Sequence, residues 1–345
     1  MTPILRDLLL MLLKIVIMTN VLLGLFSLMT LVERRVLAFM QFRLGPNRVG
    51  PFGLFQPIAD GIKLFFKEEV MPAAANTWAF FAAPAVAVTA AFMAIATVPY
   101  GPPFTLPFTN IRVNPQIADL DVGLLFILAV TSLGVYSVVL AGWSANSKYS
   151  LLGGLRSSAQ MFSYELALGM AFVGVIMLAG SFRISDIVAA QGGSILNWNV
   201  MPWRQGLAAV VYFIAAMAEV SRTPFDLPEG ETELVAGYHT EYSSMKFALM
   251  QMAEYINMIT VSVLTTNLFL GGWNPGLSFL PTGGLWGLVY FALKVFFVLF
   301  VFIWMRGTVP RFRYDQLMHF GWKVLIPLAA LNVLGTAAVV ALWKR

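Results

Sequence analysis

Residues 286–305 read WGLVYFALKVFFVLFVFIWM, a stretch of twenty residues in which Lys294 is the single charge. A helix rises about 1.5 Å per residue, so this stretch is long enough and apolar enough to cross the roughly 30 Å hydrocarbon core of a bilayer. The chain repeats such segments along its whole length. The others lie at 8–31, 77–98, 122–142, 159–179, 247–270 and 324–343, with a weaker one at 204–221. The sequence therefore predicts an all-α polytopic membrane protein with eight transmembrane helices, forming a single membrane domain over residues 1–345.

The composition supports the same class of protein. Of the 345 residues, 59% are hydrophobic and 11% are charged, which is typical of an integral membrane protein rather than a soluble domain. The first apolar segment is too long for the core of a signal peptide, so we expect it to stay in the mature chain. The net charge of +5 could suggest nucleic acid, but the basic residues lie beside the apolar segments, where membrane topology explains them. We therefore predict no nucleic-acid partner.

The residue types also limit the chemistry. The chain has no cysteine, which excludes disulfides, cysteine-ligated iron–sulfur clusters and zinc–thiolate sites. Only His239 and His319 could supply imidazole, and neither belongs to a convincing motif, so we predict no metal site. We expect His239 to lie at a surface or interface. Any redox centre would then belong to a partner or a substrate.

The distribution of Lys and Arg predicts the orientation in the membrane. The connections 32–76, 143–158, 222–246 and 306–323 hold 6, 2, 2 and 4 of these residues, whereas the alternate connections hold 1, 1 and 0. Because positively charged connections stay in the cytoplasm, the first set is predicted to be cytoplasmic. Both termini are then expected outside.

The first of these connections contains an amphipathic stretch at 51–67. Its apolar residues fall within an arc of roughly 120° on a helix, and its polar residues fall on the other side. The apolar set is Leu54, Phe55, Ile58, Ile62, Phe65 and Phe66, and the polar set is Gln56, Asp60, Lys63 and Lys67. We predict an interfacial helix on the cytoplasmic side, in contact with membrane lipid or an amphipathic ligand. A surface helix packed on the other spans is the alternative.

Three acids lie inside the apolar segments at similar depth. Glu165 and Glu254 are about seven and eight residues from the cytoplasmic ends of their segments, or about 10–12 Å deep, and Glu219 lies near the cytoplasmic end of 204–221. A carboxylate at membrane depth is costly unless it is paired, is protonated or lines a cavity. Lys294 lies near the middle of its own segment, so a structural pair of Glu254 with Lys294 is one alternative.

A second acidic group follows directly after residue 221. The stretch 222–234 reads RTPFDLPEGETEL and carries Asp226, Glu229, Glu231 and Glu233. A solvated surface loop would explain these acids. Their continuity with the three acids inside the apolar segments instead favours a hydrated proton path that is entered from the cytoplasmic side.

Several long motifs resemble one family. These are residues 41–51 (QFRLGPNRVGP), 53–63 (GLFQPIADGIK), 141–149 (AGWSANSKY), 157–165 (SSAQMFSYE), 218–234, 241–244 (EYSS), 252–255 (MAEY) and 310–318 (PRFRYDQLM). Together they are similar to the H-subunit family of the bacterial proton-pumping NADH:quinone oxidoreductase, respiratory complex I. The motifs extend from the first apolar segment to the eighth, so the resemblance covers essentially the whole chain.

The resemblance implies a location at the heel of the complex, in the bacterial inner membrane, where the membrane arm meets the peripheral arm. The chain would form the membrane-facing part of the quinone chamber, with helix 51–67 and the first and sixth spans around the entrance. The quinone-chamber residues implied are Arg43, Arg48, Phe55, Ile58, Phe225, Asp226, Arg311 and Arg313. The proton-coupling residues implied are Glu165, Glu219, Glu229, Glu231, Glu233, Glu254 and Lys294.

The resemblance also implies an indirect mechanism. Quinone is the substrate, either ubiquinone or menaquinone, and FMN and the iron–sulfur clusters belong to partner subunits, so this chain binds no cofactor alone. Reduction of quinone would send an electrostatic or protonic signal through the acids toward the antiporter-like subunits. One departure is Gly134, where some relatives carry a glutamate. A proton route through that acid cannot operate unchanged in this chain.

Two alternatives have other functions. The chain would also fit the membrane anchor of a related proton-pumping [NiFe]-hydrogenase or formate hydrogenlyase, in which no quinone need bind. The intact helix 51–67 and the acidic loop favour the quinone enzyme. A stand-alone ion transporter would function when expressed alone, and the absence of an evident inverted repeat argues against it.

Overall fold

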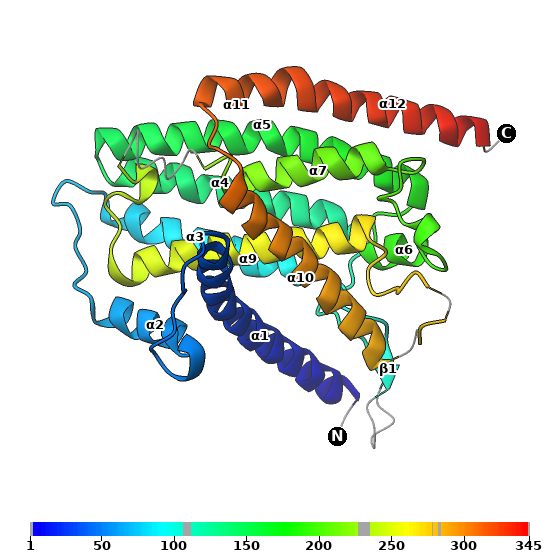
Figure 1. Ribbon diagram of the computed structural model, residues 1–345, viewed down its shortest axis with the longest axis horizontal. Coiled ribbons are helices and arrows are strands. Elements are labelled where there is room, and N and C mark those ends of the chain that lie inside the picture. Colours follow the sequence, from blue (N-terminus) through cyan, green and yellow to red (C-terminus); the bar gives the residue numbers. More distant parts are fainter. Residues whose placement is uncertain (1–2, 106–111, 227–234, 278, 282–283, 344–345) are drawn as a thin grey trace.

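The computed structural model describes residues 3–105, 112–226, 235–277, 279–281 and 284–343, and Figure 1 shows their arrangement. Helices dominate this part of the chain. The longer ones are α1 (Pro3–Met40), α3 (Thr77–Ile95), α4 (Gly123–Ser144), α5 (Lys148–Ala179), α7 (Gly206–Glu219), α9 (Ser244–Phe269), α10 (Leu285–Thr308) and α12 (Ile326–Trp343). Shorter elements are η1 (Pro51–Gly53), α2 (Gln56–Phe66), α6 (Ile184–Ala189), η2 (Ile195–Asn197), η3 (Gly237–His239), α11 (Tyr314–Phe320) and η4 (Gly321–Leu325). β1 (Phe104–Thr105) pairs antiparallel with β2 (Arg112–Val113).

Seven helical segments in the described part of the chain are long and apolar enough to cross a membrane. They are Leu8–Met40, Thr77–Ile95, Gly123–Ser144, Lys148–Ala179, Ser244–Phe269, Leu285–Thr308 and Tyr314–Leu342. This confirms the prediction of a helical protein that crosses the membrane many times. The eighth predicted span corresponds to α7, which is apolar but has only 14 residues.

The helices form a bundle with two oblique members. In Figure 1, α3, α4, α5, α7, α9 and α12 run in roughly the same direction, while α1 and α10 cross in front of α9. Aromatic residues fill the centre, where the Tyr212 ring lies 5.4 Å from that of Phe172 and 5.3 Å from that of Phe269. α4 and α5 approach closely at Gly142 and Gly154, where a Cβ atom on Gly142 would lie 2.8 Å from a backbone oxygen. Close helix contacts through small residues are typical of membrane bundles.

The amphipathic stretch differs in detail from the prediction. The helix α2 begins at Gln56 rather than at residue 51, because Phe52 has a positive φ of 52° and belongs to a separate short turn. Pro57 lies in the first turn of α2, where its missing N–H costs nothing, so it starts the helix instead of kinking it. The apolar side chains of Ile58, Ile62 and Phe65 are exposed in this chain.

One continuous helical rod contains a π turn. α11 passes through the π-helical segment η4 into α12 without a break. Two hydrogen bonds hold the turn against α5: the Tyr164 hydroxyl donates to the Leu317 carbonyl at 2.9 Å, and Trp322 Nε1 donates to Ser163 Oγ at 3.2 Å. The turn thereby fixes the rod on the bundle at one end of α12.

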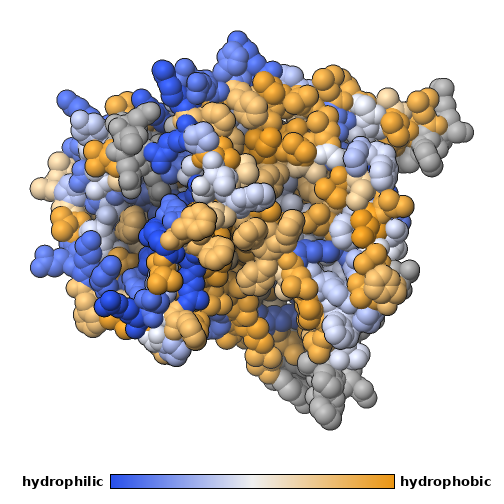
Figure 2. All heavy atoms as spheres, in the orientation of Figure 1, coloured by the Kyte–Doolittle hydropathy of each residue, from blue (hydrophilic) through white to orange (hydrophobic). Residues whose placement is uncertain are grey.

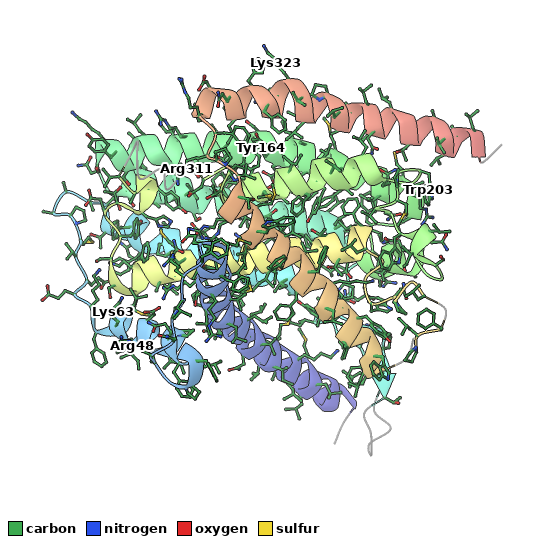
Figure 3. All side chains as sticks on the ribbon, viewed as in Figure 1. Arg48, Lys63, Tyr164, Trp203, Arg311 and Lys323 are labelled. Atoms are coloured by element: carbon green, nitrogen blue, oxygen red, sulfur yellow. The ribbon has the colours of Figure 1, made fainter. Side chains whose placement is uncertain are left out.

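The surface divides by polarity. In Figure 2, hydrophilic residues gather at the end of the molecule where α2 lies, and hydrophobic residues cover much of the middle. Figure 3 labels Arg48 and Lys63 at this hydrophilic end. The distribution agrees with a bundle whose middle faces lipid and whose charged end faces water.

Candidate functional site

Glu254 is the centre of a buried polar cluster. It lies on α9, and its Oε1 accepts a hydrogen bond from the Tyr238 hydroxyl at 2.9 Å and lies 3.2 Å from His239 Nε2. The other carboxylate oxygen lies 4.0 Å from Arg222 Nη2, just beyond the end of α7. Tyr238 and His239 belong to the short turn η3, which packs against α5 so closely that a Cβ on Gly153 would lie 2.6 Å from Gly237 Cα.

The prediction for His239 was wrong. The residue is 4% exposed and contacts an intramembrane acid, so it is part of the buried site rather than of a surface. The structural alternative for Glu254 was wrong as well. Lys294 donates hydrogen bonds to the carbonyl oxygens of Leu270, Gly272 and Asn274 at 2.6, 2.9 and 2.6 Å, at the far end of α9. The geometry therefore gives Lys294 a role in capping α9, and the acids whose side chains the structure describes form no ion pair with it.

Arg222 joins the Glu254 cluster to α1. Its guanidinium lies 3.6 Å from Glu33 Oε1 on α1 and 4.4 Å from the centre of the Tyr255 ring. Glu33 also accepts a hydrogen bond from Arg306 on α10. Arg222 and Glu33 are 7% and 4% exposed, so these charges offset each other in a largely dry environment. Glu33, Arg222 and Arg306 were not among the predicted site residues.

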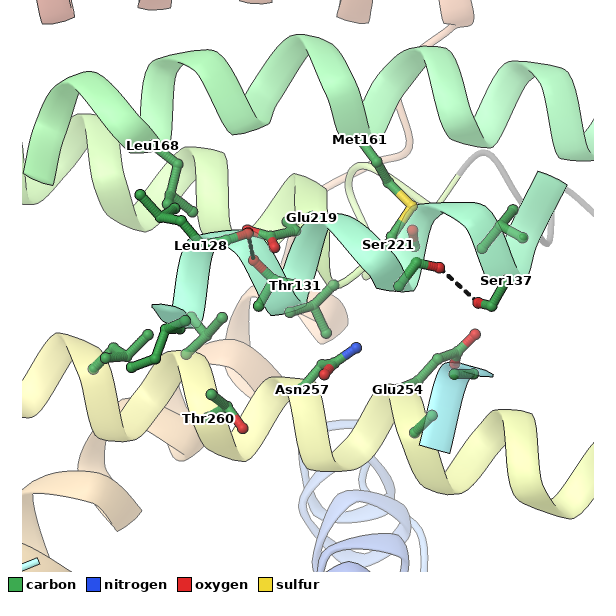
Figure 4. A pocket seen from close by; sticks show the side chains of 18 of the residues that line it. Leu128, Thr131, Ser137, Met161, Leu168, Glu219, Ser221, Glu254, Asn257 and Thr260 are labelled. Atoms are coloured by element: carbon green, nitrogen blue, oxygen red, sulfur yellow. Dashed lines mark hydrogen bonds between the residues drawn. The ribbon is translucent and has the colours of Figure 1, made fainter. Parts of the chain in front are cut away.

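A small cavity connects Glu219 with Glu254 (Figure 4). Its volume is about 60 Å³, and a buried water needs roughly 10–15 Å³ on this measure, so it can hold about four waters. Polar side chains on its wall include Thr131, Ser137, Ser221, Asn257 and Thr260. Gly134 also lines it and leaves open space where a side chain would be. The cavity can thus support a short chain of waters between the two acids.

Glu165 is near Glu219 but does not line this cavity. Ser132 donates a hydrogen bond to Glu165, and Thr131 does so to Glu219, as Figure 4 also shows for the second pair. The two carboxylates are close enough to interact electrostatically. The structure therefore brings together the three predicted intramembrane acids, in the order Glu165, Glu219 and Glu254.

Asp226 and Arg311 form a second ion pair outside the membrane-spanning segments. Arg311 Nη2 lies 2.9 Å from Asp226 Oδ2. The neighbouring Phe225 is 4% exposed and packs between the rings of Tyr164 and Phe312, at 5.6 and 5.7 Å. Phe225 is therefore a core residue that holds Asp226 in place.

The pKa of Asp226 gives a pH-dependent prediction. Burial raises this pKa from 3.8 to about 6, although Arg311 opposes the rise. The folded protein thus favours the neutral form, and this stability is complete below the unfolded pKa and is lost as pH rises through about 6. Asp226→Asn keeps the side chain neutral, so its stability relative to the wild type should increase by on the order of 3 kcal/mol between pH 4 and pH 8. Thermal unfolding of the purified complex at a series of pH values measures this difference.

The matched control is Asp315→Asn. It removes a carboxylate that is paired with Arg313 at 3.2 Å but is exposed in this chain, with 68% of its side chain accessible. Equal pH behaviour of the two variants would contradict the role assigned to burial of Asp226.

The remaining predicted residues lie apart from this buried cluster or outside the described residues. Arg43, Arg48, Arg313, Phe55 and Ile58 are exposed in this chain. Glu229, Glu231 and Glu233 fall within 227–234, which lies outside the described residues. Within the described part, no group of three or more His, Asp and Glu side chains could hold a metal ion.

A larger cavity adjoins the cluster from the side of α2. It has a volume of about 560 Å³ and lies between α1, α2 and α9. Its wall includes Phe26, Arg34, Asp60, His239 and Tyr255. Arg34 and Asp60 form an ion pair at 2.5 Å between α1 and α2. His239 therefore lies on the wall of this cavity while it contacts Glu254, which lines the smaller one.

Comparisons with known proteins agree with the resemblance noted in the sequence. A family described as NADH dehydrogenase matches residues 13–337. The chain is 52% identical over 346 residues to NADH-quinone oxidoreductase H subunit 2 of Koribacter versatilis, covering 97% of this chain and 98% of the relative. It is 52% identical to H subunit 1 of Geobacter sulfurreducens, covering 91% and 90%, and 50% identical to the H subunit of Thermomicrobium roseum, covering 95% and 94%. The chain therefore belongs to the H-subunit family of NADH-quinone oxidoreductases.

Proposed function

We propose that this chain is the heel subunit of an NADH:quinone oxidoreductase in the bacterial inner membrane. Membership in the H-subunit family supports a role as a multi-pass membrane component of the proton-translocating complex. In this proposal quinone is the substrate, FMN and the iron–sulfur clusters belong to partner subunits, and the chain binds no cofactor alone. The chain forms a single membrane domain, with α7 as an eighth span and both termini outside.

The cavity between α1, α2 and α9 supports a quinone site. Its volume of about 560 Å³ falls within the roughly 300–1,000 Å³ of typical ligand pockets. Apolar residues such as Phe26 and Leu64 suit an isoprenoid tail, and Arg34, Asp60 and His239 provide polar contacts. In the proposal, this cavity is the entrance to a quinone chamber that peripheral subunits complete.

One observation carries the proposed coupling: His239 lies between the two cavities. It lines the larger one and lies 3.2 Å from Glu254, which lines the smaller, water-sized one. A change of charge in the larger cavity can therefore reach Glu254 through the single contact between His239 and Glu254. From there the small cavity extends to Glu219, which interacts with Glu165. We infer that these acids transmit an electrostatic or protonic signal, with Glu229, Glu231 and Glu233 nearer the quinone.

The exposed basic residues support docking of the peripheral arm. Arg43, Arg48 and Arg313 are exposed in this chain, and the two that follow α1 lie in the same connection as α2. In the proposal they contact partner subunits. Purification through a tag on this chain tests the assembly. Recovery of flavin and iron–sulfur subunits with inhibitor-sensitive NADH:quinone activity is expected, whereas recovery of a nickel–iron subunit without quinone activity would replace the proposal with the hydrogenase anchor.

Substitution of two adjacent residues of α2 tests the proposed quinone entrance. Gly61 lines the large cavity and has open space at its Cβ position, so Gly61→Trp should fill the entrance. We expect kcat/KM for a long-tail quinone to fall about tenfold or more, while NADH oxidation by a hydrophilic artificial acceptor stays unchanged.

Ile62→Trp is the control for this experiment, because Ile62 is 55% exposed and does not line the cavity. Steady-state kinetics of both variants, in complexes of equal subunit content, separate the effects. If Gly61→Trp retains wild-type kcat/KM for the long-tail quinone, the entrance lies elsewhere.

A further inference from the structure

A third cavity lies on the opposite half of the bundle from the quinone entrance. It has a volume of about 600 Å³ and lies between α1, α9, α10 and the connection that follows α3. Figure 1 shows α1 and α10 running obliquely across the same face of the bundle, in front of α9. The wall is apolar along most of its length, with Met18, Leu22, Val263, Phe291 and Val295 among its residues.

The dimensions of this cavity match one leaflet of a bilayer. On α1 the lining residues run from Lys14 to Leu25, and on α10 they run from Leu288 to Leu299. Each interval is 11 residues, or about 16 Å of helix. Half of the roughly 30 Å hydrocarbon core is about 15 Å. The cavity is therefore as long as one leaflet is thick, and it is bounded by this chain on several sides.

Polar groups lie at one end only. The Lys14 ammonium donates a hydrogen bond to the backbone carbonyl of Gln116 at 3.2 Å, in the connection after α3. Among the residues whose side chains are described, no carboxylate lies within 4.0 Å of Lys14 Nζ. Lys14 thus places a positive charge at one end of this apolar cavity, which we call the slot. A lysine near the end of a transmembrane helix can extend its ammonium to the membrane–water interface.

We propose that this slot binds one acyl chain of an anionic phospholipid from the outer leaflet, with the lipid phosphate at Lys14. A phosphate at this level would accept hydrogen bonds from an ammonium that has no described carboxylate partner. The acyl chain would extend beside Val21 and Phe291 toward Leu25 and Leu299. Of the seven long helices, α1 is the least buried in this chain. The bound lipid would fill the space between α1 and the rest of the bundle.

The proposal is independent of the quinone assignment, since it concerns other residues and the other leaflet. Its test uses the whole complex, reconstituted in phosphatidylcholine vesicles that contain phosphatidylglycerol with a diazirine in one acyl chain. After illumination, mass spectrometry maps the adducts. Adducts are expected on the slot-facing residues of 17–25 and 288–299, in excess over the lipid-facing residue Leu293, which is 63% exposed and does not line the slot.

Two pairs of variants sharpen the test. Ala292→Trp should fill the slot and reduce these adducts about tenfold, whereas Leu293→Trp, on the adjacent residue, should leave them unchanged. Lys14→Gln should reduce labelling by phosphatidylglycerol several-fold but not labelling by a phosphatidylcholine probe. Lys323→Gln, at an exposed lysine in η4, is the control for loss of charge.

Three results would overturn the proposal. Equal labelling of Leu293 and the slot residues would show ordinary contact with bulk lipid. Loss of the adducts on addition of a long-tail quinone would assign the slot to a quinone tail, and cross-links to another subunit's peptide would assign it to a protein partner. If Ala292→Trp prevents assembly, the adduct map of the wild-type complex and the Lys14→Gln comparison still test whether the slot binds an anionic lipid.

Discussion

Arg222→Met should strongly destabilise the assembled complex and abolish proton translocation. Arg222 is 7% exposed and faces Glu33 and Glu254 from one position, so its removal leaves two carboxylates without their shared cation. Breaking a buried ion pair by removing one partner costs about 3–5 kcal/mol. Arg222→Lys should rescue only partly, because a lysine cannot spread its donors over both carboxylates and stack on Tyr255 as the guanidinium does.

The measurement is thermal unfolding of the complex in detergent, together with proton uptake in vesicles. Lys323→Met is the control, since this lysine is exposed, belongs to neither the buried cluster nor the proposed docking residues, and its loss should change stability by about 0.5 kcal/mol or less. The double variant Arg222→Met with Glu254→Gln should recover part of the stability, because one uncompensated charge is then removed. If Arg222→Met is as stable and as active as Lys323→Met, the cluster is not the centre of the site.

Gly134→Leu should uncouple quinone reduction from proton translocation or stop both. The Cβ of this residue would meet open space in the cavity between Glu219 and Glu254, so a leucine can enter the cavity and displace water. Filling a cavity of about 60 Å³ removes the waters that the proposed path needs. Proton pumping by the vesicle-reconstituted complex should fall about tenfold or more relative to the wild type.

Two other substitutions at Gly134 distinguish blocking of the cavity from disturbance of the helix α4. Gly134→Ala should retain pumping because a methyl group leaves room for water, and Gly134→Glu should also retain it because it adds a carboxylate to the path. Gly24→Leu, at a helical glycine of α1 that also faces open space, controls for the helix itself. Full pumping by Gly134→Leu would show that protons do not use this cavity.

Local sequence patterns predicted the long apolar helices and the positions of the intramembrane acids along them. An apolar run near 20 residues long has few ways to fold other than as a membrane helix. The positions of Glu165 and Glu254 along their helices follow from counting residues at a fixed rise. The family resemblance also rests on local patterns, namely contiguous motifs. The comparisons confirm it over nearly the full chain.

The contacts that connect distant segments were not predictable in this way. Glu33 comes directly before Arg34 and Arg35 in the sequence, yet α1 extends to Met40 and places Glu33 beside Arg222 and Arg306. His239 comes two residues after Gly237, which packs closely on α5 at Gly153, and this tertiary contact places the imidazole beside Glu254. The start of α2 depended on the positive φ of Phe52, which the helical periodicity of 51–67 does not reveal.

The π turn at Gly321–Leu325 leads into the last helix. A π turn holds one more residue than an α turn, so deletion of one residue there would leave a regular helix with the following residues at the same angle, whereas deletion of one residue in the regular part of α12 before Asn332 would rotate the rest of α12 by about 100°. Gln205 now bonds Thr336 at 2.7 Å and Asn332 at 2.8 Å across α7 and α12. After the rotation, these polar residues would face the acyl chains and an apolar face would meet Gln205. The π turn can thus lose one residue without changing which side of α12 faces lipid, whereas a gap of one residue in the regular part of α12 changes the membrane surface.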